Sequence, residues 1–111
     1  MFRKIDPFRF SALIVFALAL FAALPARGDD VAATFKAKCA GCHAADGSGD
    51  SPAGKAMKTP DLRSDEVQKM TDAQLIDATT NGKGKMPAYK GKITDDQIKD
   101  LVAFIRTLAK K

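Results

Sequence analysis

The segment Cys39-Ala40-Gly41-Cys42-His43 constrains this chain more than any other. Two cysteines three positions apart lie on one face of a helical turn, so both thiols can reach the same flat ring. This is the spacing by which a polypeptide attaches a c-type haem covalently, with each sulfur adding to one vinyl group. The adjacent His43 can then donate an imidazole nitrogen to the iron. The motif therefore predicts one covalently bound haem c.

Three other kinds of site share parts of this motif. A redox dithiol of the thioredoxin kind needs a strand–helix–strand context, and no strand pattern surrounds the cysteines. A structural zinc site needs four ligands of the cysteine or histidine kind, whereas the chain has two cysteines and one histidine. A simple disulfide leaves the histidine unexplained. Haem attachment accounts for all three residues, and the single histidine excludes ligation by two histidines of this chain.

Residues 1–28 have the pattern of a secretory signal peptide. A basic start precedes an apolar run over residues 10–24, and small residues follow it at a cleavage site. The run is shorter than the roughly 20 residues that span a bilayer, which favours cleavage over a membrane anchor. We therefore expect residues 1–28 to be removed on export to the periplasm or an equivalent compartment. Residues 29–111 then form one small domain with no stable membrane insertion.

Removal of this segment changes the charge of the chain. The full sequence has a net charge of +5, whereas residues 29–111 keep 14 basic and 12 acidic residues. Two haem propionates would bring the remaining +2 close to zero. Nucleic-acid binding, which the high isoelectric point of the full chain suggests, is therefore not expected. A domain this small has a marginal hydrophobic core, and a buried haem would stabilise it.

The expected elements are helices, because no alternation of the strand type is present. We expect a first helix over residues 30–39 and a helical turn near residues 64–69. Two capping boxes, at Thr71 and Thr94, predict the starts of two further helices. The last helix carries one apolar stripe, formed by Ile98, Leu101, Val102, Ile105 and Leu108. Residues 44–60 read as a long glycine-rich loop, whose length is unusual unless it wraps something such as a haem edge.

The second axial ligand is sought among the three methionines after residue 28. Met70 precedes a capping box and is placed to form a hydrophobic staple with Leu75. Met57 follows the haem motif and is placed to pack against the ring. Met86 lies in a polar loop rich in glycine and lysine, directly before Pro87, where burial of an apolar side chain needs a special reason. We therefore predict axial ligation by His43 and Met86, one of the common haem pairings.

The haem motif, the Met86-Pro87 loop and the closing helix around residues 101–106 together resemble the class I monohaem cytochromes c of the small bacterial kind. The resemblance covers residues 30–108. It implies an all-α small cytochrome c fold, in which three to four helices wrap around one covalently bound haem. It also implies that the first and last helices cross, which would bring Phe35 and Phe104 together.

The chain departs from this family at two positions. Many members use a tryptophan to hold a haem propionate, and this chain has none. Tyr89 or a lysine is expected in its place. Members also commonly have a proline whose carbonyl accepts a hydrogen bond from the ligand histidine, a role for which we predict Pro52.

The predicted function is that of an exported carrier of single electrons and not of an enzyme, since two protein ligands leave no open position on the iron. We expect a monomer that meets redox partner proteins through lysines around the exposed haem edge, although an ordinary solvated face explains such lysines equally well. These are Lys36, Lys38, Lys83, Lys85, Lys90 and Lys92. The alternatives are a haem enzyme or gas-binding sensor with an open distal site, and a cytochrome subunit of a larger oxidoreductase.

Overall fold

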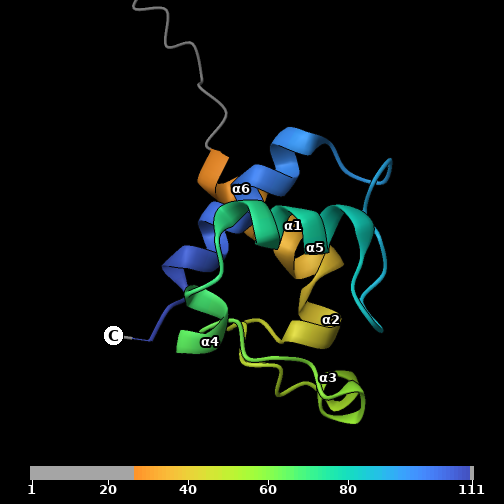
Figure 1. Ribbon diagram of the computed structural model, residues 1–111, viewed down its shortest axis with the longest axis vertical. Helices are drawn as coiled ribbons and strands as arrows, with labels where there is room; N and C mark the ends of the chain where they lie inside the picture. The colour runs from red at the N-terminus through yellow and green to blue at the C-terminus, as the bar shows by residue number, and fades with distance from the viewer. Residues whose placement is uncertain (1–26, 111) are drawn as a thin grey trace, which may run out of the picture.

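The computed structural model describes residues 27–110, which form six helical segments and no β-strand beyond two isolated bridges (Figure 1). The segments are α1 (Arg27–Lys38), α2 (Ala40–His43), α3 (Pro52–Met57), α4 (Asp65–Gln68), α5 (Asp72–Asn81) and α6 (Asp95–Thr107). Residues 1–26 of the expected signal peptide lie outside the described part. Among the described helices, none has the length and apolar character needed to cross a membrane.

The first and last helices pack against each other, as the family resemblance implies (Figure 1). The rings of Phe35 and Phe104 meet there, with centroids 5.1 Å apart and planes inclined by 51°. The apolar stripe of α6 faces inward: Ile98, Leu101 and Val102 are almost completely buried. Burial of each such side chain contributes about 1.5–3 kcal/mol. Helix α6 therefore contributes more buried apolar side chains to the core than any other described helix.

Both predicted capping boxes are present. At the start of α5, the Gln74 amide N–H donates to the Thr71 hydroxyl (3.1 Å), and the Thr71 N–H donates to the Gln74 side chain (2.9 Å). At the start of α6, the Gln97 main-chain N–H donates to the Thr94 hydroxyl (3.1 Å), and the Thr94 N–H donates to the Gln97 side chain (2.8 Å). These local bonds fix where the two helices begin, and therefore where the loop between them runs.

The segment over residues 44–60, which the sequence analysis treats as a loop without structure of its own, contains a helix. Here α3 begins at Pro52. The preceding residue, Ser51, caps the helix: its hydroxyl accepts a hydrogen bond from the Gly54 N–H (2.9 Å). Serine before proline at a first helical position is a common start signal. The helical turn expected near residues 64–69 is α4, and the expected three to four helices become six because α2 and α3 are additional short segments of four and six residues.

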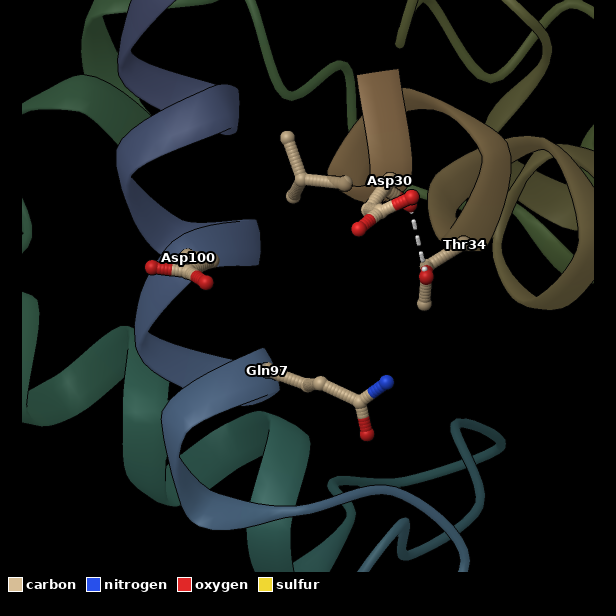
Figure 2. A pocket seen from close by; sticks show the side chains of 5 residues that line it. Asp30, Thr34, Gln97 and Asp100 are labelled. Carbon is tan, nitrogen blue, oxygen red and sulfur yellow. Dashed lines mark hydrogen bonds between the residues drawn. The ribbon is translucent and has the colours of Figure 1, made fainter. Parts of the chain in front are cut away.

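A small cavity of about 120 Å³ lies between the first halves of α1 and α6 and is lined mainly by polar residues (Figure 2). It is lined by Asp30, Val31, Thr34, Gln97 and Asp100. The Thr34 hydroxyl donates to the Asp30 carbonyl at 2.9 Å, the bond drawn in Figure 2. No cysteine, histidine or methionine lines this cavity. The predicted haem residues lie around a different and larger one.

Candidate functional site

A cavity of about 540 Å³ brings the four principal predicted haem residues together. Its wall includes Cys39, Cys42, His43 and, from a loop more than 40 positions further along the chain, Met86. The volume falls within the range typical of sites for bound organic molecules. Most of the remaining wall is apolar and comes from the core, including Phe35, Leu62, Val67, Leu75, Leu101 and Ile105. The site is therefore built into the hydrophobic core and not on the surface.

The cysteines lie on the first turn after α1. Cys39 caps α2, and its carbonyl accepts hydrogen bonds from the N–H groups of Cys42 (3.2 Å) and His43 (2.9 Å). The two thiols are half-buried and are not joined to each other. Burial raises the pKa of Cys39 to about 11. A catalytic redox dithiol needs a lowered thiol pKa, so this environment does not suit the thioredoxin-like alternative.

His43 is the only histidine of the chain, and its ring lines the cavity. Burial lowers its pKa, so the imidazole is neutral and its nitrogen lone pair is free for a metal. The carbonyl of Pro60 acts in the opposite direction and raises the pKa. However, the buried Nδ1 has no partner within the usual hydrogen-bond limits. We interpret the Pro60 carbonyl as a close neighbour that a small rotation of the ring would convert into an acceptor.

The proline beside the histidine is thus not the predicted one. Pro52 is the first residue of α3 and does not line the cavity, whereas Pro60 does. The prediction chose the first proline after the haem motif. It missed that Pro52 belongs to a helix start, which leaves the next proline to return the chain toward His43. Pro60 is therefore the candidate for the role that was predicted for Pro52.

Helix α3 packs against the haem motif, and its last residue, Met57, also lines the cavity. The Ser51 hydroxyl lies 2.7 Å from the Gly41 carbonyl and 3.1 Å from the Cys42 carbonyl, so it can donate to either. Gly54 packs so closely that a Cβ atom there would collide with the Cys42 carbonyl. Neither Ser51 nor Gly54 was predicted from the sequence to take part in the site. The Ser-Pro start of α3 was the available signal, although it does not show which surface the helix would meet.

Met86 lies in the loop that joins α5 to α6, and it is half-buried while its chain neighbours are exposed. A tight turn shapes the loop: the Lys83 N–H donates to the Met86 carbonyl (3.1 Å), and the Met86 N–H donates to the Lys83 carbonyl (3.0 Å). Met57 and Met70 line the same cavity. Met70 and Leu75 are both part of the core, as their predicted staple requires.

Tyr89 lines the cavity, but its hydroxyl is not free to meet a propionate. It donates to the main-chain carbonyl of Lys38 at 2.7 Å. Burial is the main cause that raises the Tyr89 pKa, and the nearby thiols of Cys39 and Cys42 add to the rise. The ammonium of Lys92 lies 5.8 Å from the centre of the ring, within cation–π range.

The six predicted docking lysines are all exposed, and they fall into two groups. Lys38, Lys83 and Lys85 line the cavity, whereas Lys36, Lys90 and Lys92 do not. Lys58, which the sequence analysis did not single out, is exposed and lines the cavity. It follows Met57 at the end of α3, a helix that the prediction lacked.

The residues around the cavity fit a covalently bound haem. Two unpaired thiols and a neutral imidazole open onto one largely apolar space of suitable size. Within residues 27–110, no three acidic, cysteine or histidine side chains are grouped so that they could hold a metal ion. A metal at His43 therefore needs further ligands, which the four nitrogens of a porphyrin supply.

Comparison with known proteins agrees with this geometry. A family model described as cytochrome c oxidase, cbb3-type, subunit III matches residues 26–105. The chain belongs to the c-type cytochromes. Cytochrome c6 of Nostoc sp. is 39% identical to this cytochrome over 101 residues, which cover 85% of this chain and 87% of that protein. Cytochrome c6 of Thermostichus vulcanus is 33% identical over 111 residues, covering 93% and 94% of the two chains.

A solved structure shows the same fold. The KustC0563 c-type cytochrome superposes with a TM-score of 0.66 and 26% sequence identity, over 71% of this chain and 96% of that one. The family, the relatives and the fold together confirm three predictions from the sequence: the all-α cytochrome c fold, one covalent haem c and an electron-carrying function. The alternatives of an open haem enzyme or sensor and of an oxidoreductase subunit are not favoured.

Proposed function

We propose that this cytochrome is an exported carrier of single electrons in which His43 and Met86 bind the iron from opposite faces of the haem. The observation that carries the proposal is the single cavity shared by both side chains and both cysteine thiols. When bound, the haem iron supplies a one-electron couple between Fe(II) and Fe(III). The protein's part is to hold that couple, to set its potential and to present it to partners.

The side chains around the cavity favour the reduced state. An imidazole with a lowered pKa and a thioether both bind without adding charge, and methionine opposite histidine raises the potential. The apolar wall disfavours the extra positive charge of the oxidised iron. With both faces occupied, no position remains for a substrate, so we propose that the protein has no enzymatic activity.

We also propose that Pro60 orients the imidazole. The Nδ1 atom is buried without a partner, and the Pro60 carbonyl is the main-chain group that affects the pKa of the ring; if Nδ1 donated to that carbonyl, Nε2 would be the nitrogen left to face the iron. A hydrogen bond at Nδ1 would fix this tautomer and strengthen the ligand.

The redox partners that we propose carry acidic surfaces, and the protein meets them as a monomer. Exposed lysines surround the mouth of the cavity, so an acidic patch opposite them would bring its redox centre toward the haem edge. The contributors are Lys38, Lys58, Lys83 and Lys85, with Lys36, Lys90 and Lys92 farther out. Attraction of this kind speeds encounter and weakens as salt screens it.

Stopped-flow electron transfer to an acidic redox protein tests this surface. We expect Lys85→Gln to lower the rate at low salt about two- to fivefold and to flatten its dependence on ionic strength. Lys99→Gln is the matched control because Lys99 is an exposed residue of α6 that does not line the cavity. It should change neither the rate nor its dependence on ionic strength. A wild-type rate that does not depend on salt would contradict the docking proposal.

Export is proposed from the pattern of residues 1–28. Mass spectrometry of the haem-containing protein from the periplasmic fraction would give its first residue. A mass that corresponds to a chain starting near residue 29 supports cleavage, whereas a full-length chain with Met1, found in the membrane fraction, contradicts it.

The ligation proposal is tested by absorption spectra of the oxidised protein. A weak far-red band from sulfur-to-iron charge transfer should be present in the wild type, lost in Met86→Ala and kept in Met57→Ala. Met57 is the matched control because it lines the same cavity. Absence of the band from the wild type, together with ready carbon monoxide binding after reduction, would favour an open site instead.

A further inference from the structure

The loop that carries Met86 is fastened to the rest of the molecule at few points. Between the end of α5 and the start of α6, most residues are exposed, and the bonds within the loop are short-range turns. In the described part of the chain, and apart from the capping bonds of Thr94 at the start of α6, three hydrogen bonds join this loop to other elements. Two are main-chain bonds to the last turns of α5: Tyr89 N–H to the Thr79 carbonyl and Lys90 N–H to the Thr80 carbonyl, each 3.0 Å.

The third bond differs from these two because it leaves the loop's own neighbourhood. The Tyr89 hydroxyl donates to the carbonyl of Lys38 at 2.7 Å, across 51 positions of sequence. Lys38 is the last residue of α1 and directly precedes Cys39, the first attachment cysteine. The last carbonyls of a helix have no partner within the helix, so the phenol satisfies an acceptor that would otherwise need water. This bond joins the two walls of the cavity.

Because Tyr89 is close to Met86 in the chain, its bond to Lys38 limits how far Met86 can move from the cavity. The two residues are three positions apart, and three residues of extended chain span roughly 10 Å at most. While the phenol is bound to the end of α1, the methionine therefore cannot move far from the cavity. When that bond is broken, the loop is still bonded to α5 and, through Thr94, to the start of α6, but no hydrogen bond in the described part of the chain ties it to α1.

We infer that Tyr89 is a positioning residue, whose hydrogen bond to the Lys38 carbonyl keeps the Met86 loop closed over the cavity. The inference rests on the proposed ligation by Met86. In this role, Tyr89 does not bind the iron itself and affects it only through the position of Met86. In this account, the phenol sets how often the loop opens and releases the iron's sixth position.

The surroundings of the ring support this role. Burial raises the pKa of Tyr89, so the hydroxyl keeps its proton and remains a donor at ordinary pH. The Lys92 ammonium, 5.8 Å from the ring centre, adds an attraction within the loop that holds the ring in place. The substitution Tyr89→Phe keeps this ring and its packing and removes only the hydroxyl.

Binding of imidazole to the oxidised holoprotein measures loop opening, because imidazole can bind only after Met86 has left the iron. We expect Tyr89→Phe to keep the far-red sulfur band and to raise the imidazole association constant about two- to tenfold, the range that one net hydrogen bond explains. Thr107→Val is the matched control. It removes an exposed hydroxyl that donates to the Phe104 carbonyl, at a site that does not line the cavity, and should leave the constant unchanged.

Thermal unfolding of the same three proteins separates positioning from general stability. A purely structural bond would lower the melting temperature in both variants without changing imidazole binding.

If Tyr89→Phe shows the band and binds imidazole like the wild type, the positioning role is wrong and Met86 ligation still holds. If the wild type itself lacks the band, Met86 ligation fails and the inference fails with it. If Tyr89→Phe does not fold, Lys92→Gln, which removes the ring's cationic neighbour, must still raise imidazole binding, and an unchanged constant overturns the inference.

Discussion

The two walls of the haem cavity are held in different ways. On the histidine side, α2 is continuous with α1 and is supported by α3, where Gly54 leaves no room for even a methyl group against the Cys42 carbonyl. On the methionine side, the loop is largely exposed, and between its capping bonds at the start of α6 and the end of α5 it is held by two main-chain bonds to α5 and by the Tyr89 hydroxyl. The histidine wall is therefore made of closely packed helices, whereas the methionine wall is a loop held by a few hydrogen bonds.

This difference separates two tasks. The histidine wall must retain the haem, so packing and covalent bonds hold it. The methionine wall must set the potential and can open without loss of the haem, because neither thioether bond belongs to it. The predictions below test this division, beginning with the largest effect.

Replacement of each axial residue should have unequal consequences. We expect His43→Ala to abolish recovery of folded holoprotein, since the only imidazole is lost from the packed wall. Met86→Ala should retain covalent haem, while its midpoint potential falls by on the order of 0.1 V. Haem-stained gels and redox titration measure the two outcomes. Equal recovery of haem by both variants would contradict the division of tasks.

Packing of α3 against α2 can be tested with two glycines. A Cβ at Gly54 would strike the main chain of the haem motif, so Gly54→Ala should lower the free energy of unfolding by about 1–3 kcal/mol. A Cβ atom at Gly41, in α2 itself, would have no neighbouring heavy atom within 4 Å, so Gly41→Ala is the matched control. Its stability should change by less than about 1 kcal/mol. Chemical denaturation measures both, and similar losses in the two variants would show that α3 does not brace the motif.

The buried histidine predicts a pH dependence. Because the pKa of His43 in the folded protein is lowered from its ordinary value of 6.5, the unfolded chain binds a proton first as the pH falls. Stability is complete above pH 6.5 and decreases below it, by up to about 1.4 kcal/mol per pH unit. Asp61, whose pKa is lowered chiefly by a hydrogen bond from Arg63, loses its contribution only below its ordinary value of 3.8. A free energy of unfolding that is constant from pH 7 to pH 5 would contradict the neutral, buried imidazole.

The smallest effect concerns the residue after His43. Ala44 has φ 62° and ψ 163°, a region that glycine adopts almost alone, so the chain is strained where it leaves the haem motif. We expect Ala44→Gly to raise the free energy of unfolding by about 1 kcal/mol. Ala103→Gly, at an exposed position within α6, should lower it by a similar amount. Destabilisation by both substitutions would show that the strain at Ala44 is absent.

The sequence predicted features that depend on local chemistry. The haem motif, the capping boxes at Thr71 and Thr94 and the stripe of α6 each lie within a few turns of chain, and each is present in the structure. The meeting of Phe35 with Phe104 was also predicted, although it came from the resemblance to a known family.

What the sequence could not predict depends on contacts between distant segments. The choice of Pro60 over Pro52 follows from how α3 folds back, and no local pattern encodes it. The bond from Tyr89 to Lys38 joins residues 51 positions apart, and its acceptor is a main-chain carbonyl that every residue possesses. The support that Ser51 and Gly54 give to the haem motif was missed for the same reason.

The central claim is that Met86, from the loosely held wall, binds the iron opposite His43. Proton NMR of the reduced protein tests it most directly, because a methyl group bound over the face of the haem is shifted far upfield by the ring current. The account predicts one such methionine methyl signal, which is lost in Met86→Ala and kept in Met57→Ala. The absence of an upfield methyl from the wild type, or its loss in Met57→Ala instead, would contradict the account.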